Sequence, residues 1–120
     1  MSRPTTTWKI TLNSPWYEFV RDGKKLYEGR SAKNDVTKYA AGDLLEIRHH
    51  VNNTSPAYTK KIVSLTLFRD FRAALTSLGL GTVLPGVETI DEGVKVYYRY
   101  VSQTTQDTHG VCMIELAEVS

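Results

Sequence analysis

The residues whose types and spacing could do chemistry lie together in the stretch GKKLYEGR, residues 23–30, which holds two glycines and four charged side chains. Side chains alternate between the two faces of an extended strand, so Leu26, Glu28 and Arg30 are expected to share one face. If Leu26 faces the core, a carboxylate and a guanidinium point inward with it, and they must pair or face a wet cleft to offset their desolvation. Lys25 lies just after the turn that opens the stretch, so its amine is expected to point into the same cleft.

This cluster of charges fits either an architectural role or a ligand site. In the architectural interpretation, Glu28 and Arg30 form an ion pair and both lysines stay solvated. In the ligand interpretation, Lys25 and Arg30 donate to a phosphate, Glu28 accepts from a base edge or orients Arg30, and an aromatic ring stacks on the base. Trp16 could supply this ring, or it could be a core residue instead. The residues predicted to bind such a ligand are Lys24, Lys25, Glu28, Arg30, Trp16 and Tyr97.

The same residues allow a catalytic alternative, a small hydrolase. A desolvated lysine can lose its proton near neutral pH, so Lys25 could act as a base while Glu28 orients water or serves as an acid. The neighbouring carboxylate opposes this role, because it favours the charged ammonium unless burial dominates. We therefore expect a binding protein before an enzyme, with Lys25 and Glu28 as the catalytic pair in the alternative. A third interpretation is a protein-partner module, in which the basic face and the helix expected at 71–78 dock another protein.

Length and composition describe one ordinary globular domain. The chain has 120 residues, of which 41% are hydrophobic and 23% charged, and this suits a single core and excludes disordered and fibrous classes. We expect residues 1–7 to form a disordered arm and residues 8–120 to form a single domain. No apolar run approaches the roughly 20 residues that span a bilayer, and the first residues lack the apolar segment of a signal peptide. An intracellular, soluble protein of the cytoplasm or nucleus, without membrane contact, is therefore expected.

Neither a metal nor another cofactor is predicted. Cys112 is the sole cysteine, which excludes an internal disulfide and a multi-cysteine zinc site, and its apolar neighbours predict a buried thiol. His49 and His50 are adjacent, so on a strand they face opposite sides and do not easily share one ion. The third histidine, His109, is distant in sequence.

Charge is unevenly distributed along the chain. Residues 1–84 carry 13 Lys or Arg against 7 Asp or Glu, whereas residues 85–120 carry 2 against 6, within a net charge of +2. The first two thirds of the chain can therefore make a basic face, and such faces attract phosphates. This distribution is compatible with nucleic-acid binding but does not by itself indicate it.

Apolar periodicity predicts a small, strand-rich fold. Apolar and polar residues alternate where strands are expected, and apolar residues recur at helical spacing where helices are expected. Strands are expected near residues 8–12, 26–30, 44–48, 58–68 and 110–116, and helices near 15–22, 71–78 and 90–100. Residues 52–56 have the composition of a turn between two antiparallel strands, residues 80–87 that of an irregular link and residues 103–109 that of a polar linker. A β-dominated α+β fold follows: a partly closed β-barrel of about five to six strands, with about three short helices over its openings.

Helix caps and stripes locate the expected helices more closely. The residues expected to cap them place a side-chain oxygen just before an apolar stripe, and they are Ser14, Asp70 and Thr89. In the first helix Trp16, Phe19 and Val20 fall at helical spacing and are expected to be buried. Tyr17 is then expected to lie on another side.

The charged stretch resembles a known pattern. It fits the GxKxxExR motif of the ASCH domain, a member of the PUA-like superfamily, with Gly23, Lys25, Glu28 and Arg30 at the motif positions. The resemblance continues in the order and spacing typical of one branch of that family, through FRAAL at 71–75, GL at 79–80, VLPGV at 83–87, IDEGVKVY at 90–97, Ser102 and GV at 110–111. It covers roughly residues 8–117, and the chain is identified as a member of this family.

Resemblance to the ASCH family implies a PUA-like β-barrel with a cleft beside the GxKxxExR strand. Domains of this family have been proposed to bind RNA; some small members are amidohydrolases acting on acylated cytidine, and ribonuclease activity has been suggested for others. Carried onto this chain, Lys25 is the cleft amine, with Glu28 and Arg30 as its polar neighbours. The amidohydrolase branch has a threonine nucleophile at the position of Glu28 and a downstream glutamate as proton donor, and this chain departs from both. Single-stranded RNA, a nucleotide or a modified nucleoside is therefore the expected partner, and no oligomeric state is predicted.

Overall fold

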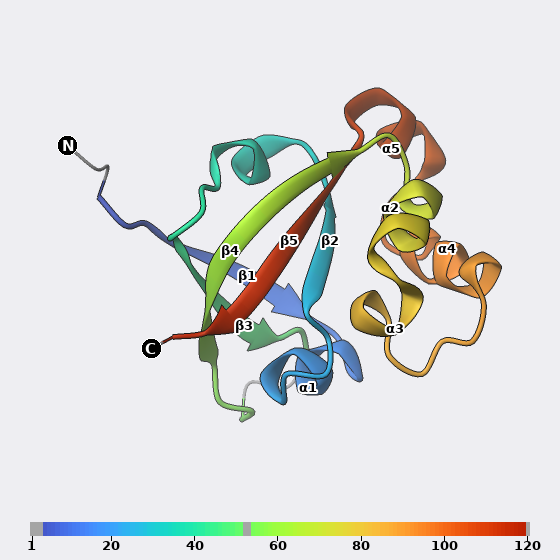
Figure 1. Ribbon diagram of the computed structural model, residues 1–120. Helices are drawn as coiled ribbons and strands as arrows, with labels where there is room; N and C mark the ends of the chain where they lie inside the picture. The colour runs from blue at the N-terminus through green and yellow to red at the C-terminus, as the bar shows by residue number, and fades with distance from the viewer. Residues whose placement is uncertain (1–3, 52–53, 120) are drawn as a thin grey trace.

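One curled sheet of five strands forms the body of the protein, for which a computed structural model describes residues 4–51 and 54–119 (Figure 1). The strands are β1 Thr7–Leu12, β2 Tyr27–Ser31, β3 Leu44–His49, β4 Tyr58–Phe68 and β5 Val111–Glu118. Their order in the sheet is β1-β3-β4-β5-β2, so the first two strands of the chain lie at its two edges. The strand-rich α+β fold and the partly closed barrel predicted from the sequence are confirmed.

Strand pairing leaves a seam between the edge strands β1 and β2. β1 and β3 are parallel, and the pairs β3-β4, β4-β5 and β5-β2 are antiparallel. This confirms the hairpin predicted between β3 and β4; residues 52–53 of its turn lie outside the described residues. Arg30 Nη2 on β2 donates to the Thr11 carbonyl on β1 over 3.1 Å. A side chain therefore links the two edge strands at the seam.

The sheet begins at Thr7, close to the start of the described residues. The Thr6 amide donates to the Asp43 carboxylate over 3.1 Å. Residues 1–3 of the predicted arm lie outside the described residues. The Asp43 carboxylate also accepts from the Trp8 indole at 3.0 Å. These contacts hold the start of β1 against the turn that precedes β3.

Helices form a layer on one side of the sheet (Figure 1). The members of this layer are α2 Phe71–Leu78, α3 Leu80–Val83, α4 Ile90–Tyr98 and α5 Gln103–His109, and outside it are α1 Trp16–Arg21 and the 3-10 helix η1 Asn34–Lys38. Three of these were not predicted: α3 falls in the expected irregular link, α5 falls in the expected polar linker, and no helix was expected at the position of η1. The prediction of about three helices was therefore too low. Within the described residues, no helix has the length and apolar character needed to cross a membrane.

The unpredicted helix α5 forms without an apolar stripe because its contacts are polar. The Ser102 hydroxyl caps it by accepting from the Thr105 amide at 3.1 Å. Gln106 is buried, and its side-chain carbonyl accepts from the Phe71 amide at the start of α2 over 3.0 Å. Its side-chain nitrogen donates to the Tyr98 hydroxyl at 3.1 Å. These partners lie outside the segment, so its own composition indicated only a linker.

The caps predicted for α2 and α4 are confirmed. The Asp70 carboxylate accepts from the Ala73 amide at 2.7 Å, and the Thr89 hydroxyl accepts from the Glu92 amide at 3.1 Å. α2 ends at Gly79, whose φ of +92° lies in the left-handed region that favours glycine. These are local interactions, which explains why the sequence indicated them.

The prediction for α1 was wrong in its cap and only partly right in its buried face, since Val20 is buried as expected but Trp16 and Phe19 are half-buried. Ser14 Oγ donates to Glu18 Oε2 at 2.8 Å, and the helix has no side-chain cap. Tyr17, expected on another side, is buried as well. In a helix this short the apolar spacing fits more than one face, so tertiary contacts select the one that packs on the barrel.

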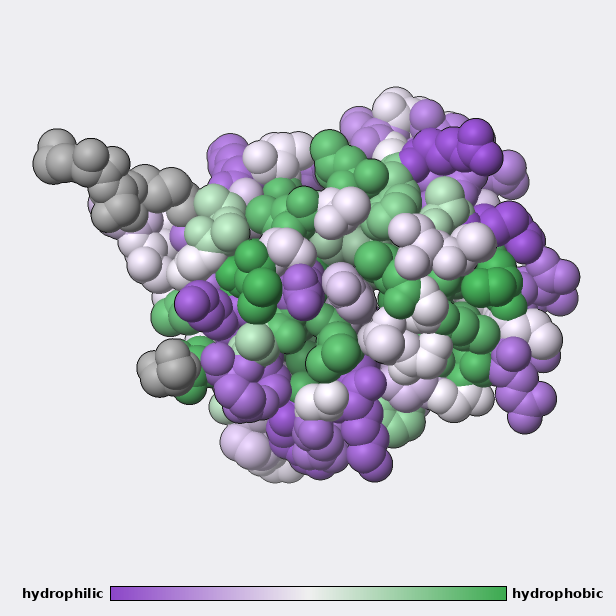
Figure 2. Space-filling view, viewed as in Figure 1, coloured by the Kyte–Doolittle hydropathy of each residue, from purple (hydrophilic) through white to green (hydrophobic). Residues whose placement is uncertain are grey.

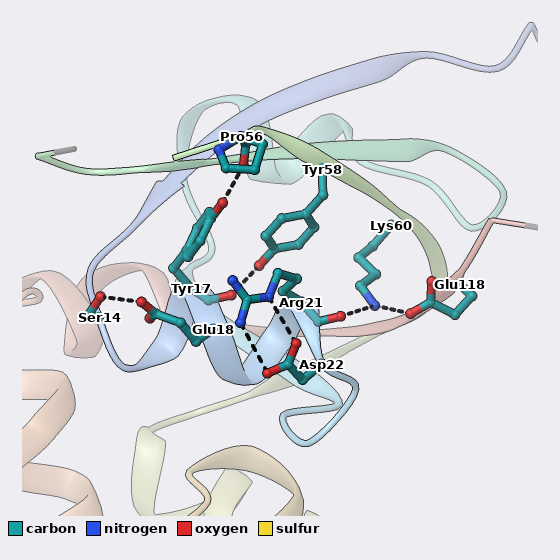
Figure 3. A network of polar contacts seen from close by, with 9 residues as sticks. All are labelled: Ser14, Tyr17, Glu18, Arg21, Asp22, Pro56, Tyr58, Lys60 and Glu118. Carbon is teal, nitrogen blue, oxygen red and sulfur yellow. Dashed lines mark hydrogen bonds and ion pairs between the residues drawn. The ribbon is translucent and has the colours of Figure 1, made fainter. Parts of the chain in front are cut away.

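Polar contacts hold α1 against the barrel (Figure 3). The Tyr17 hydroxyl donates to the Pro56 carbonyl, and the Tyr58 hydroxyl donates to the Tyr17 carbonyl at 2.6 Å. The ammonium of Lys60, a buried residue on β4, donates to the Arg21 carbonyl at the end of α1 over 3.3 Å. These contacts fix α1 in place, and with it the turn that leads into the charged stretch.

Apolar cores cover both faces of β5. Cys112, Ile114 and Leu116 face the barrel interior, whereas Val111 and Met113 face the helix layer. Figure 2 shows apolar side chains gathered over the middle of the molecule and hydrophilic ones mainly towards its rim. β5 is apolar along most of its length because both of its faces are covered. The prediction that Cys112 is a buried thiol is confirmed, and burial raises its pKa.

A candidate ligand site beside the charged strand

A cavity of about 480 Å³ lies beside β2 at the seam between β1 and β2. Its volume is in the range of small-molecule sites, roughly 300–1,000 Å³. The residues that line it come from β1, α1, β2, α4 and adjoining segments, and they include Thr11, Leu12, Trp16, Lys25, Glu28, Arg30, His50, Leu84, Tyr97 and Tyr100. The structure thus brings five of the six predicted ligand-binding residues to one cavity. The sixth, Lys24, is exposed and does not line it.

Lys25 is buried by the turn that follows α1. Gly23, with φ +77°, reverses the chain, and the amides of Lys24 and Lys25 both donate to the Phe19 carbonyl at 2.9 and 3.0 Å. The Lys25 side chain is then only 2% exposed, and its ammonium donates to the Val83 carbonyl in α3. An ammonium carries three N–H groups. The Val83 carbonyl therefore leaves donor capacity for a molecule in the cavity.

Glu28 lies between two cations. Its Oε1 is 4.0 Å from Lys25 Nζ, and its Oε2 accepts from Arg30 Nε at 2.9 Å. The Glu28 side chain is 7% exposed and that of Arg30 is 32% exposed, so the charges run from the interior to the mouth of the cavity. The condition that Leu26 faces the core is not met, because β2 begins at Tyr27 and Leu26 is 41% exposed. The architectural ion pair is present, and it borders a cavity.

Burial lowers the pKa of the Lys25 ammonium to about 8. Loss of hydration is the largest cause, since an ammonium is poorly solvated by protein. The Glu28 carboxylate raises this pKa and the Arg30 guanidinium lowers it further. The sequence argument left open whether burial outweighs the carboxylate, and here it does. Lys25 can therefore act as a donor when charged and as an acceptor in the neutral form near pH 8.

Tyr97 contributes a hydroxyl to the site. Its ring stacks on Phe71 with centroids 4.1 Å apart and an interplanar angle of 6°, so it is not an open platform for a base. The hydroxyl is buried and has no hydrogen-bond partner among the described residues, and burial raises its pKa, so it stays protonated. A Cβ on Gly29 would lie 2.9 Å from this hydroxyl oxygen, so only glycine fits there without a shift. The backbone of β2 therefore passes close to a hydroxyl that has no partner among residues 4–51 and 54–119.

Two further aromatic rings border the cavity. Trp16 is half-buried, and Lys25 Nζ lies 5.5 Å from its ring centroid. Tyr100 is 55% exposed and was not among the predicted site residues. Its position three residues after Tyr97 would place both on one helix face, a signal that was present in the sequence. His50, also missed, reaches the cavity from the end of β3, and no local pattern indicated this.

Several solved protein structures resemble this one. No family model and no curated protein matches the sequence. The hypothetical protein PH0355 is 28% identical with a TM-score of 0.83, over 95% of this chain and 100% of its own. Protein PF0455 from Pyrococcus furiosus is 26% identical with a TM-score of 0.77, over 96% of this chain and 99% of its own. ASCH from Zymomonas mobilis is 12% identical with a TM-score of 0.65, over 94% of this chain and 68% of its own.

The protein therefore has the fold of an ASCH domain, and the identification made from its GxKxxExR stretch is confirmed at the level of the fold. PH0355 and PF0455 share this architecture over nearly their whole lengths. One fold hosts many functions, so the activity has to be argued from the site.

Proposed function

We propose that this chain is a nucleotide-binding ASCH domain whose cavity beside β2 holds one base of a single-stranded RNA or of a nucleotide. The observation that carries the proposal is the buried hydroxyl of Tyr97, which has no partner among the described residues and belongs to a residue that lines the same cavity as Lys25 and Glu28. Leaving a buried hydroxyl unpaired costs about 1–3 kcal/mol. A ligand that accepts its hydrogen bond removes this cost.

The polar groups around the cavity complement a base edge. Lys25 and Tyr97 are donors, and the Glu28 oxygen that Arg30 does not engage is an acceptor. Unstacked bases of single-stranded RNA present carbonyl acceptors together with amino or imino donors on their edges. The Trp16 ring offers a surface for stacking, which contributes about 1–3 kcal/mol per base.

The charge at the mouth of the cavity suits a phosphate. Arg30 is partly exposed there, and Glu28 and the β1 backbone hold its guanidinium in place. A guanidinium with fixed orientation binds phosphate through paired N–H groups. A base inside and a phosphate outside together describe a nucleotide.

The substitution Tyr97→Phe tests this proposal, because it removes the unpaired hydroxyl and keeps the stacked ring. We expect RNA or nucleotide affinity to fall about fivefold, since one hydrogen bond contributes about 1 kcal/mol. The free energy of unfolding should stay the same or rise. Tyr27→Phe is the matched control, because it removes a half-buried tyrosine hydroxyl on β2 that does not line the cavity.

Titration followed by NMR locates the ligand. Resonances of Lys25, Glu28 and Arg30 should shift on adding single-stranded RNA or a nucleotide, and the affinity should fall with salt. A Tyr97→Phe variant that binds as tightly as the wild type would remove the central observation. Resonances that stay unchanged in a folded protein would remove the proposal.

A small hydrolase is the second candidate, because the pKa of Lys25 is lowered to about 8. A neutral Lys25 amine could take a proton from water as the water oxygen attacks an acyl carbon of a modified nucleoside. The resulting ammonium could then return a proton to the leaving amine. Glu28, 4.0 Å from Lys25, could orient the water.

Product release from acylated nucleosides tests the hydrolase. Activity should rise with pH through about 8, where Lys25 loses its proton. Lys25→Ala should abolish it, and Lys24→Ala, at the exposed neighbouring position, should leave it unchanged. A wild-type protein that is inert on a panel of acylated nucleosides would leave binding as the function.

A further inference from the structure

A second hollow, of about 440 Å³, continues from the proposed base cavity. It lies among β1, β2, β3 and η1, and it shares Thr11, Arg30 and Ser31 with the first cavity. Thr11 and Arg30 are the two residues whose hydrogen bond links the edge strands. The two hollows therefore meet at the seam, with the Arg30 guanidinium at the junction.

Cations predominate around this second hollow. Lys9, Lys33 and Arg48 line it together with Arg30, against a single lining carboxylate, Asp35. Basic side chains gather here because Lys9 and Arg48 occupy exposed positions of the parallel strands β1 and β3. Their chain neighbours Ile10 and Ile47 point into the barrel core.

The acidic groups nearby pair with Arg48 and Lys38, and not with Lys9 or Lys33. Glu46, which lies opposite Lys9 in the register of β1 and β3, pairs with Arg48 at 3.2 Å. Asp35 lies 3.9 Å from Lys38. Lys9 and Lys33 form no ion pair within residues 4–51 and 54–119. Their charge is therefore available to an anion in the hollow.

An aromatic ring, that of Tyr39, also lines the second hollow. Tyr39 is half-buried and rests against Trp8 with ring centroids 5.1 Å apart. Stacking on such a ring tolerates any base, because every base has a π-face. A wall with lysines and one aromatic ring is typical of surfaces that follow a nucleic-acid strand without reading its sequence.

We propose that this second hollow binds the phosphates next to the base held in the first cavity, so that the ligand is a single-stranded oligonucleotide and not an isolated nucleoside. This inference rests on the proposed function and extends it. A lone nucleoside would use the first cavity and leave Lys9 and Lys33 without a role. A base seated beside Lys25 must leave its stack, so the strand is single where it crosses the seam.

The experiment compares two kinds of probe. Adenosine, cytidine, guanosine and uridine lack phosphate and report the base cavity alone, through NMR shifts of Lys25 and Tyr97. Hexaribonucleotides rA6, rC6, rU6 and r(GU)3 report both hollows, through fluorescence anisotropy at several salt concentrations. The variant is the double substitution Lys9→Gln with Lys33→Gln. The control, Lys61→Gln with Lys95→Gln, removes the same charge from exposed positions that line neither hollow.

We expect the wild type to bind at least one hexamer, and the Lys9/Lys33 variant to bind it about tenfold more weakly than the control does. The slope of log affinity against log salt should fall by about 1.4, because two phosphate contacts in a single strand are lost. Nucleoside shifts should stay the same in both variants.

Two different results would overturn the inference. If nucleosides shift Lys25 and Tyr97 but the Lys9/Lys33 variant binds the hexamers as the control does, the second hollow is not a phosphate site and the proposed function stands. If nucleosides do not shift those resonances and no hexamer binds the wild type, the proposed function fails and the inference fails with it.

Discussion

Lys25 makes the stability of this protein depend on pH in a way that one substitution isolates. Its pKa is about 8 in the folded protein, against an ordinary value of 10.5. Below pH 8 the ammonium is charged in both states, and its burial destabilises the fold. Between about pH 8 and 10.5 the unfolded chain holds a proton that the folded chain has released, so the free energy of unfolding rises with pH. A pKa lower by about 2.5 corresponds to about 3 kcal/mol.

Lys25→Met removes this titration and keeps a side chain of similar length. The variant does not leave the Glu28 carboxylate without an ion-pair partner, because Arg30 still pairs with it at 2.9 Å. We expect the stability of the wild type, relative to the variant, to increase by about 3 kcal/mol from pH 7 to 10.5. The comparison has to be a difference, because burial raises the pKa of other groups, which lowers the stability of both proteins towards high pH; these groups include Tyr58, Tyr97 and Cys112.

Urea unfolding followed by tryptophan fluorescence at a series of pH values measures the difference. Lys24→Met is the control, since Lys24 is exposed and its removal should give a flat difference. A flat difference for Lys25→Met as well would mean that the Lys25 amine keeps an ordinary pKa. The burial argument for the site, and the hydrolase alternative with it, would then be refuted.

Three further predictions follow from other contacts. Gly29→Ala should destabilise the fold by about 1–3 kcal/mol and weaken ligand binding, because the new methyl would lie 2.9 Å from the Tyr97 hydroxyl. Urea unfolding and the nucleotide titration measure the two effects, and a Gly29→Ala variant that binds as tightly as the wild type would contradict this prediction. Arg30→Lys should weaken nucleotide binding by about 1–2 kcal/mol, because an ammonium cannot span a carboxylate and a β1 carbonyl as the guanidinium does; binding equal to the wild type would contradict this. Asp70→Ala should lower the unfolding free energy by about 1 kcal/mol through loss of the α2 cap, with no effect on binding. Calorimetry measures the unfolding free energy, and a value equal to that of the wild type would contradict this prediction.

Local chemistry accounts for the parts of the fold that were predicted correctly. Asp70 and Thr89 cap their helices through amides three residues away, so composition and spacing indicate them directly. The hairpin between β3 and β4 and the apolar strand β5 were likewise visible as short-range patterns. The face of α1 and the existence of α5 were not, because Tyr17 and Gln106 are held by residues 35 or more positions away.

The candidate site also combines features that short-range patterns indicated with features that depend on distant segments. The stretch from Gly23 to Arg30 contains its own ion pair, since Glu28 and Arg30 are two residues apart on one strand, and its charges marked the place where chemistry is concentrated. Whether those charges border a cavity depended on segments far along the chain. Val83 supplies the carbonyl that holds Lys25, and Tyr97 supplies the unpaired hydroxyl.

Sequence alone therefore indicated which side chains carry the charge, the family pattern that they fit and the strand-rich class of fold, because these depend on neighbours within a few positions. Folding settled the burial of Lys25, its lowered pKa and the hollow that adjoins it. Desolvation depends on every atom packed around a group, and the groups near the Lys25 ammonium include Trp16 of α1, Val83 of α3 and Tyr97 of α4, which no short-range pattern joins to β2.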